Sequence, residues 1–456
     1  MTFEVVPIET PTLGDRSYLA HDGRLAVVVD PQRDIDRIIA LAGSHGVEIA
    51  HVVETHIHND YVTGGRALAA ATGAAYHVNG EDPVRFAREP VVAGSAIEVS
   101  PSLGLRVVAT PGHTFTHLSY VLSSQGRVVG VFTGGSLLFG STGRPDLLGP
   151  ARTPVLVRAQ HASVRRLAAE LPDDAAIFPT HGFGSFCSAT QTDGTASTIG
   201  HERKVNPALT QDERSYVEEL LAGLDAFPAY YAWMAPANLA APDGSPDLSP
   251  PRLADADELR RRIEAGEWVV DVRERRAFAA GHLPGTVNLG MDGQFATYLG
   301  WLVPPGTPLT LLGRTPGDVA EAQRELVRIG IDRPSRAAVG TPADWTGGAP
   351  PATTRLATFE DLQAARSERD PVVLDVRRRL EWAQAHLAGA VHLPLHELQD
   401  RLADVPVGEV WVHCRSGYRA AVAASLLAAS GRGVVCVDDE FANAEKAGVE
   451  IVHAGS

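Results

Sequence analysis

The sequence predicts a multidomain protein of the α/β and α+β classes, and three observations support this fold class. The chain has 456 residues, enough for about three domains of ordinary size. Short aliphatic, β-branched runs alternate with helical patterns over residues 1–235, as in a mixed α/β domain. Beyond a Pro-rich segment, one α/β pattern then occurs twice, which indicates two copies of a smaller domain.

The composition excludes several classes of protein. Hydrophobic residues make up 44% of the chain, enough to build cores and to exclude general disorder. The net charge of −15 repels polyphosphates and anionic lipids, so neither nucleic acid nor a membrane is expected as a partner. The N-terminus lacks a signal-peptide pattern and no stretch is long enough to span a bilayer. Three cysteines are too few for a disulfide framework, and we expect a cytoplasmic protein.

The first expected domain covers residues 1–235 and ends at a Pro-rich linker, residues 236–252. The linker is expected to be extended because its Pro, Ala, Asp and Ser residues form neither a stable helix nor a central strand. Helices are expected over 35–44, 65–72 and 154–171. Strands are expected over 25–30, 47–54, 105–109, 118–122, 128–132 and 176–179.

Histidines follow several of these strands. His56, His58 and Asp60 come directly after the strand 47–54, whereas His113 and His181 follow later strand ends. Neutral imidazoles with a carboxylate suit zinc or iron. We therefore predict one transition metal among these five residues. A purely structural role for the histidines is the alternative.

The repeat follows the linker. Asp271 corresponds to Asp375 and Gly285 to Gly389, each pair 104 residues apart. The first copy is expected over 253–345 and the second over 356–456, with a Gly/Pro-rich seam between them.

Cys414 in the second copy is the candidate nucleophile. It stands between a predicted strand, 411–413, and an Ala-rich helix, 420–429. A strand, tight loop and helix start direct backbone N–H groups at one point, and so stabilise a thiolate or an anionic persulfide. A buried structural cysteine is the alternative. Gly313 occupies the corresponding place in the first copy, so that copy is expected to act as a spacer, a dimer surface or a docking module.

The second copy resembles the rhodanese family. The resemblance rests on D-V-R at 375–377, H-L-A-G at 386–389 and H-C-R-S-G-Y-R at 413–419. It implies that Cys414 carries the persulfide, that Arg415 and Arg419 shape an anion cradle, and that thiosulfate or a glutathione-type persulfide gives sulfur to a thiol acceptor. The tyrosine-phosphatase-like domains are a rival, but their C-x-x-x-x-x-R loop is one residue longer, and the smaller loop suits sulfur.

The first domain resembles the metallo-β-lactamase fold, an αββα sandwich with its site at one edge. The runs at 133–147, 179–187 and 201–209 are similar to the persulfide dioxygenases within that fold. The whole chain resembles the bacterial persulfide dioxygenase-rhodanese fusions. This resemblance implies a metallo-β-lactamase sandwich followed by two rhodanese-like domains, the first without its cysteine.

Two positions depart from that pattern. Tyr61 stands where the family has the last histidine of H-x-H-x-D-H, and Gly135 stands where it has an aspartate after T-G. A two-metal hydrolase similar to glyoxalase II needs both residues. The mononuclear iron site of the dioxygenases is similar to His56, His113 and that same aspartate, so Tyr61, Asp60 or His58 would have to complete the site. An empty site is the other outcome.

The two remaining cysteines receive different predictions. By resemblance, Cys187 would line the dioxygenase pocket, and its alternative is a small apolar filler. Cys436 lies in a V-V-C-V run and is expected in the core.

Three functional hypotheses follow. The first is a sulfurtransferase joined to a persulfide dioxygenase-like domain that holds one metal, with iron favoured over zinc. The second is a metal-dependent thioester hydrolase resembling glyoxalase II, with regulatory rhodanese units. The third is a sulfurtransferase on a catalytically dead scaffold. A homo-oligomer is expected in each case.

Overall fold

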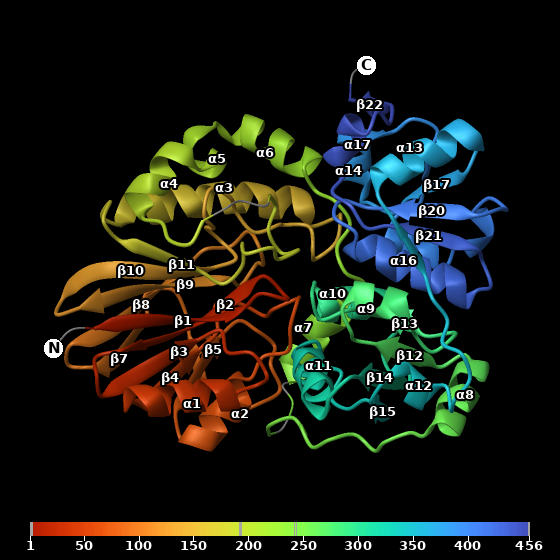
Figure 1. The fold of residues 1–456 in the computed structure, drawn as a ribbon. Helices are drawn as coiled ribbons and strands as arrows, with labels where there is room; N and C mark the ends of the chain where they lie inside the picture. The colour runs from red at the N-terminus through yellow and green to blue at the C-terminus, as the bar shows by residue number, and fades with distance from the viewer. Residues whose placement is uncertain (1–2, 191–193, 241, 243, 455–456) are drawn as a thin grey trace. The chain divides into compact units, whose positions relative to one another are not determined.

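The computed structural model describes residues 3–190, 194–240, 242 and 244–454. Its internal contacts divide the chain into two units (Figure 1). The first unit comprises Met1–Asp247 together with Val327–Gly330, and the second comprises Leu248–Leu326 and Ile331–Ser456.

Two β-sheets form the centre of the first unit. The first sheet has the order β1-β2-β3-β4-β5-β6 and the second the order β11-β10-β9-β8-β7. The strands of the first sheet are β1 (Glu4–Thr10), β2 (Asp15–His21), β3 (Leu25–Val29), β4 (Glu48–Val53), β5 (Ala75–Asn79) and β6 (Glu89–Val91). Those of the second sheet are β7 (Ala96–Ser100), β8 (Leu103–Ala109), β9 (Leu118–Ser124), β10 (Arg127–Gly134) and β11 (Ala176–Pro179).

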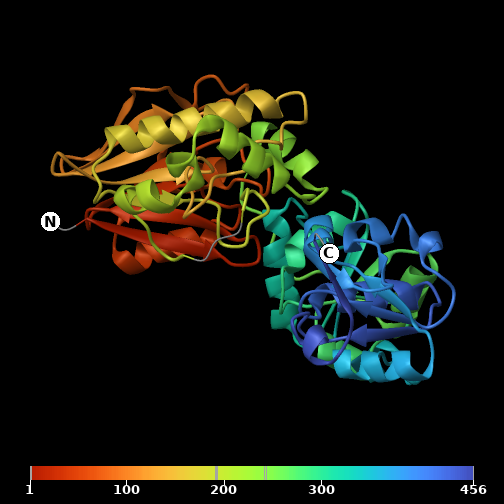
Figure 2. The ribbon, with the colours of Figure 1, turned by 90° about the horizontal axis from the view of Figure 1, so that it is seen from above.

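Helices cover the outer face of each sheet (Figures 1 and 2). Helices α1 (Asp36–His45) and α2 (Gly65–Thr72) bury Ile38 and Leu68 against the first sheet. Helix α3 (Thr153–Glu170) buries Val164 against the second sheet. The remaining helices on that side are α4 (Ile199–Val205), α5 (Pro207–Thr210) and α6 (Glu213–Ala222). Aliphatic and aromatic side chains fill the space between the sheets, so the expected αββα sandwich is confirmed.

The segment expected to be a linker begins inside a helix. Helix α7 spans Tyr231–Ala240 and contains Pro236, whereas an extended chain was expected from residue 236. Tertiary hydrogen bonds account for the difference, because the Asn238 side chain donates to the carbonyls of His58 and Tyr61, both at 2.8 Å. Anchoring of this kind overrides weak helix propensity.

The second unit contains two parallel sheets of similar design. The first has the order β13-β12-β14-β15 and the second the order β16-β21-β20-β17-β19, while β18 pairs with β22. The first copy contains α8 (Ala256–Glu264), β12 (Trp268–Asp271), α9 (Arg275–Ala280), β13 (Val287–Asn288), α10 (Phe295–Leu302), β14 (Leu309–Gly313), α11 (Pro316–Arg328), β15 (Arg336–Val339) and α12 (Pro342–Trp345).

The second copy repeats this arrangement. It contains β16 (Arg355–Ala357), α13 (Phe359–Glu368), β17 (Val372–Asp375), α14 (Arg379–Gln384), β18 (Ala385–Leu387), β19 (Val391–His392), α15 (Leu395–Leu398), η1 (Leu402–Asp404), β20 (Val410–His413), α16 (Tyr418–Ala429), β21 (Val434–Val437), α17 (Asn443–Lys446) and β22 (Ile451–His453).

The D-V-R motif has the same structural role in both copies. The Arg273 side chain donates to both carboxylate oxygens of Asp271, and Arg377 does the same to Asp375. Each aspartate ends an inner strand of its sheet, β12 or β17. The arginine of the motif therefore holds the end of that strand in place through buried, charge-assisted hydrogen bonds to the aspartate.

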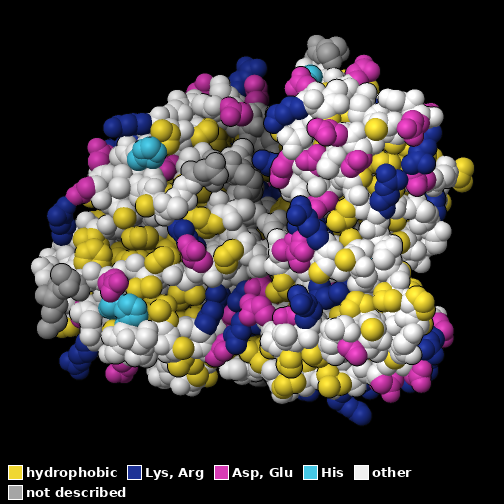
Figure 3. Space-filling model, in the orientation of Figure 1, with side chains coloured by type: hydrophobic (Ala, Val, Ile, Leu, Met, Phe, Trp, Pro, Cys, Tyr) yellow, Lys and Arg dark blue, Asp and Glu magenta, His cyan; other side chains and the backbone are white. Residues whose placement is uncertain are grey.

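No helix among the described residues is long and apolar enough to cross a membrane. On the face seen in Figure 3, acidic and basic side chains are interspersed rather than gathered by sign.

Candidate active sites

Five histidines form one buried cluster in the first unit. Their ring centroids lie 4.1 to 6.3 Å apart in the contacting pairs, and none is more than 2% exposed. Two follow β4, two lie between β8 and β9, and one follows β11. The members are His56, His58, His113, His117 and His181.

Hydrogen bonds fix the tautomers of three of them. His113 Nδ1 donates to the Arg144 carbonyl at 2.8 Å, and His181 Nδ1 donates to Asp15 Oδ1 at 2.8 Å. His56 Nδ1 lies 2.8 Å from Thr55 Oγ1, whose own proton goes to Asp30, so here too Nδ1 is the donor. In the neutral rings each Nε2 is therefore a free acceptor.

These acceptor nitrogens converge. One nitrogen from each of His56, His113 and His181 lies within 4.8 Å of the other two. The Nε2 atoms of His56 and His181 are 3.4 Å apart, and His113 Nε2 is buried without a hydrogen-bond partner in the described part of the chain. Two lone pairs that face each other need a cation between them. Two nitrogens bound tetrahedrally at about 2.0–2.1 Å from a zinc ion would be roughly 3.4 Å apart.

The donor set thus fits one transition metal. Neutral imidazoles suit zinc and iron, and metal-binding histidines usually donate their other N–H to a carbonyl or carboxylate. His113 and His181 do so here, whereas His56 donates to the Thr55 hydroxyl. Burial disfavours a charge on His181, but Asp60 and Asp15 outweigh burial and raise the pKa of His181 to about 10. Without a metal a proton balances the His56–His181 pair, and a metal ion would replace that proton.

His58 and Asp60 occupy other positions in the cluster. His58 Nε2 faces away from this set, 3.3 Å from both Asp30 Oδ1 and Glu54 Oε2. Burial opposes the charge on His58, but the two carboxylates raise its pKa to about 9. Asp60 Oδ2 lies 3.2 Å from His181 Nδ1, which is the ring nitrogen that also bonds to Asp15. His58, Asp60 and His181 form a second group whose ligand atoms lie within 4.8 Å of one another. The five predicted ligands thus fall into two groups that share His181, and ligation by all five stays a prediction.

His117 was not among the predicted site residues, although it shares a loop with His113. Its Nε2 accepts the Gly135 N–H at 3.0 Å and its Nδ1 lies 2.8 Å from Thr110 Oγ1. Both ring nitrogens are therefore used, and the ring supports the turn at Gly135. The H-T-F-T-H spacing at 113–117 was the available signal.

The thiol site lies at the end of β20 in the second unit. Cys414 is 1% exposed, and its Sγ accepts the N–H of Gly417 at 3.2 Å. Helix α16 begins at the next residue, so its positive end faces the same loop. The structure therefore forms the predicted strand, loop and helix around the sulfur.

The two predicted arginines differ in their surroundings. Arg419 makes a two-pronged ion pair with Glu381, at 2.6 and 2.7 Å. Burial disfavours the Arg419 charge, but nearby Tyr298 and Glu381 outweigh it and raise the pKa of Arg419 further. Arg415 is exposed and lines a hollow of about 500 Å³ together with Phe441. Arg419 thus ties the start of α16 to Glu381, whereas Arg415 is open to solvent.

Comparison with known proteins identifies the domains in which both candidate sites lie. The sequence matches the Metallo-beta-lactamase superfamily over residues 13–181 and the Rhodanese-like domain over residues 255–336 and 358–446. The crystal structure of a metallo-beta-lactamase from Staphylococcus aureus subsp. aureus COL aligns with a TM-score of 0.66 and 27% identity, covering 75% of this chain and all of that chain. The chain belongs to the metallo-beta-lactamase superfamily, fused to two rhodanese-like domains.

Two curated relatives resemble the metallo-beta-lactamase domain. A hydroxyacylglutathione hydrolase of Polaromonas is 32% identical over 161 residues, which is 35% of this chain and 57% of that protein. Human mitochondrial persulfide dioxygenase ETHE1 is 29% identical over 224 residues, 46% of this chain and 74% of that protein. The expected architecture, with a first rhodanese-like domain that lacks its cysteine, is confirmed.

Two residues distinguish this metallo-beta-lactamase domain from the family pattern. A Cβ atom at Gly135 would lie 2.4 Å from His113 Cδ2, so the His113 ring already fills the space of an aspartate there. The Tyr61 ring stacks on His58 with centroids 4.3 Å apart, and its hydroxyl is 3.0 Å from His58 Nε2. Gly135 thus leaves room for the His113 ring, and Tyr61 is a direct partner of His58.

Cys187 lies beside the metallo-beta-lactamase site. The side chain is fully buried, and its sulfur is within hydrogen-bonding reach of Asp60 and of Tyr231 from α7. Burial, followed by the charge of Asp60, raises the pKa of the Cys187 thiol well above its ordinary value. The thiol is therefore held protonated at neutral pH. Cys436 is buried in β21, where the sequence predicted a core residue.

In the first rhodanese-like domain, a carboxylate occupies the loop that corresponds to the Cys414 loop. The Asp318 carboxylate accepts the backbone N–H groups of Arg314 and Thr315 at 2.8 and 3.2 Å. These two backbone donors are therefore already used within the loop. Gly313 supplies no thiol, so this domain has neither a nucleophile nor a free anion site at that loop.

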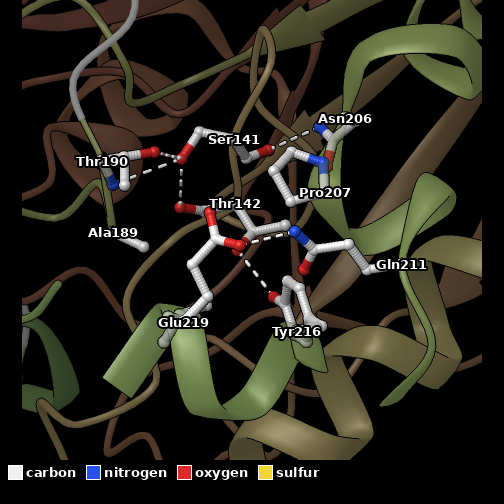
Figure 4. Close-up of a pocket in the computed structure, with 10 residues that line it drawn as sticks. Ser141, Thr142, Ala189, Thr190, Asn206, Pro207, Gln211, Tyr216 and Glu219 are labelled. Atoms are coloured by element: carbon white, nitrogen blue, oxygen red, sulfur yellow. Dashed lines mark hydrogen bonds between the residues drawn. The ribbon is translucent and has the colours of Figure 1, made fainter. Parts of the chain in front are cut away.

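A small hollow elsewhere in the metallo-beta-lactamase domain carries no comparable chemistry. Its volume is about 30 Å³, little more than the room for water. Figure 4 shows that its polar side chains bond to one another, for example Thr142 to Tyr216 at 2.8 Å and Ser141 to Thr190 at 2.7 Å. We assign it no ligand.

Proposed function

We propose that this protein is a sulfur-handling enzyme whose last domain transfers sulfane sulfur through a persulfide on Cys414. The observation that supports this most is the loop from Cys414 to Arg419, in which the sulfur accepts a backbone N–H at 3.2 Å at the start of α16. A backbone N–H and a helix N-terminus that face the sulfur stabilise its negative charge without transferring a proton to it.

The residues of the loop support a simple displacement. The Cys414 thiolate attacks the outer sulfur of thiosulfate, the S–S bond breaks, and sulfite leaves with the bonding electron pair. A thiolate acceptor then attacks the outer sulfur of the Cys414 persulfide, which returns the Cys414 thiolate and forms an acceptor persulfide. Arg415 at the exposed side of the loop attracts both anions.

Replacing Cys414 tests this step directly. We expect Cys414→Ser to abolish sulfur transfer from thiosulfate to cyanide, because a neutral hydroxyl cannot carry the sulfur. The activity is measured as thiocyanate formation, with Cys436→Ser as a control that removes a thiol outside the loop. Unchanged turnover in Cys414→Ser would refute the proposal.

We further propose that the metallo-beta-lactamase domain binds one transition metal, iron in preference to zinc, through His56, His113 and His181, and acts on a glutathione-type persulfide. The likeness to a persulfide dioxygenase supports the substrate class. The carbonyl of Arg144 and the side chains of Asp15 and Thr55 would hold the three rings in position. A bound iron would supply the redox chemistry by which dioxygen oxidises a sulfane sulfur to sulfite.

The two proposed activities share an intermediate. Sulfite from the first domain attacks the outer sulfur of the Cys414 persulfide and leaves as thiosulfate, while the Cys414 thiolate is released. Joining both activities in one chain raises the local concentration of sulfite near Cys414.

Metal content and oxygen uptake test the first domain. We expect about one iron per chain by mass spectrometry, in keeping with one set of ligands, and oxygen consumption with glutathione persulfide. Two zinc ions with thioester cleavage would favour a hydrolase instead. Absence of both metal and uptake would leave a scaffold attached to a sulfurtransferase.

A further inference from the structure

The cysteine-free rhodanese-like domain contacts the Cys414 loop directly. We infer that this domain is a brace that positions the loop for sulfur chemistry, chiefly through Arg275 and the turn from Gly290 to Gly293. The inference rests on the proposed sulfur transfer and assigns a role to a domain that has no nucleophile of its own.

The first contact passes through Asp438, which follows β21. Arg275 Nε and Arg276 Nε each donate to one of its carboxylate oxygens, both at 2.7 Å. Asp438 in turn lies against the Cys414 loop, since a Cβ atom at Gly417 would be 2.2 Å from Asp438 Oδ1. Gly417 is the residue whose N–H bonds to the Cys414 sulfur. An ion pair across the two domains thus supports the donor to the reactive atom.

The second contact is a slot for Tyr418, the first residue of α16. Its hydroxyl donates to the Gly290 carbonyl at 2.9 Å. A Cβ atom at Gly293 would lie 2.4 Å from the Tyr418 ring, so only glycine leaves room for that ring. Tyr298 of α10 closes the slot, with ring centroids 5.8 Å apart. The loop residue next to Gly417 is therefore anchored in the neighbouring domain.

The contact continues along the following elements. The Asn288 N–H donates to Ser425 Oγ of α16 at 2.9 Å, and the Trp301 ring stacks on His396 of α15 at 4.6 Å. The brace therefore holds the helix that begins at the loop as well as the loop itself.

The brace has a physical purpose at this loop. Gly417 has a φ of 92°, a left-handed conformation that the surroundings must maintain. Arg275 and Arg276 also neutralise the Asp438 carboxylate. Without them an unpaired carboxylate would lie beside an anionic sulfur and repel it.

Variants of the full chain test the brace. We expect Arg275→Ala to lower both the rate of Cys414 alkylation by iodoacetamide at pH 7 and kcat for thiosulfate by about tenfold, since small displacements at a reacting atom have effects of this size. KM should change less than twofold, because Arg415 is untouched. Arg275→Lys should restore part of the rate, and so should Asp438→Asn in the Arg275→Ala background.

Two further variants complete the experiment. Arg260→Ala is the matched control, because Arg260 forms an exposed ion pair with Asp257 in the same domain, and we expect wild-type rates. Tyr418→Phe removes only the hydrogen bond to Gly290, and we expect about a threefold loss. Wild-type alkylation in both Arg275→Ala and Tyr418→Phe would overturn the inference. Because alkylation requires no sulfur transfer, its loss in these variants supports the brace even if thiosulfate proves not to be a substrate.

Discussion

At the scale of single residues, the candidate metal centre depends on groups outside the familiar motif. Thr55 and the Arg144 carbonyl hold His56 and His113, while Asp15 at the start of β2 holds His181. The histidines themselves could be predicted because each follows a strand. Asp15 could not, because nothing in its local sequence indicates that it meets a histidine 166 positions away.

Gly135 gives the sharpest prediction at this scale. Restoring the family aspartate would add a ligand only if the site had room, but a Cβ atom there lies 2.4 Å from the His113 ring. We therefore expect Gly135→Asp to displace His113, to destabilise the domain by about 1–3 kcal/mol, and not to raise metal affinity. Gly135→Ala is the control, because it adds the clash without a carboxylate. Tighter metal binding by the aspartate variant alone, measured by chelator competition, would show that the site can accept that ligand.

At the scale of elements, the ion pair of Arg419 and Glu381 joins the start of α16 to α14. Burial alone would raise the pKa of Glu381, but Arg419 outweighs burial and lowers it from 4.5 to about 2. A lowered carboxyl pKa stabilises the fold fully above the unfolded value. This stabilisation is then lost as the pH falls through the folded value.

The Glu381→Gln variant measures this contribution. We expect it to be less stable than wild type by on the order of 2–3 kcal/mol at pH 7. The difference should shrink between about pH 4.5 and pH 2, the interval between the two pKa values. Urea unfolding at several pH values provides the measurement. Glu213→Gln, which breaks an exposed pair with Arg158, should show little difference at any pH. A difference for Glu381→Gln that persists unchanged at pH 2 would contradict the assignment.

Element prediction from the sequence succeeded where one face is clearly apolar. Helix α2 and strand β11 have the predicted bounds, 65–72 and 176–179. Strands β1 and β2 were not predicted. Pro7 lies within β1, which is tolerated because β1 lies at the edge of its sheet. A strand at the edge of a sheet can therefore form without the sequence pattern by which strands are predicted.

At the scale of the whole molecule, the two chemistries lie in different structural units. The three convergent histidines belong to Met1–Asp247, and Cys414 belongs to the unit that ends at Ser456. The sequence placed the two chemistries in separate domains because the repeat and the motifs differ, and the bounds of those domains stay predictions. It left the purpose of the cysteine-free copy open, because contacts such as Arg275 with Asp438 join residues 163 positions apart.

Because the two candidate sites lie in separate units, we expect metal removal to affect the thermal unfolding of only one unit. A metal that binds only the folded first unit, present at 100 times its dissociation constant, stabilises that unit by about 2.7 kcal/mol. Stripping it with a chelator should lower the midpoint of one thermal transition by roughly 5–11 °C, since each kcal/mol shifts the midpoint by about 2–4 °C for a unit of this size. The transition of the rhodanese-like unit should not move, because His56, His113 and His181 all lie in the first unit. Differential scanning calorimetry of the full chain measures both transitions, and Cys414→Ser should leave the metal-sensitive one unchanged. An equal shift of both transitions on chelation would mean that the two units unfold as one.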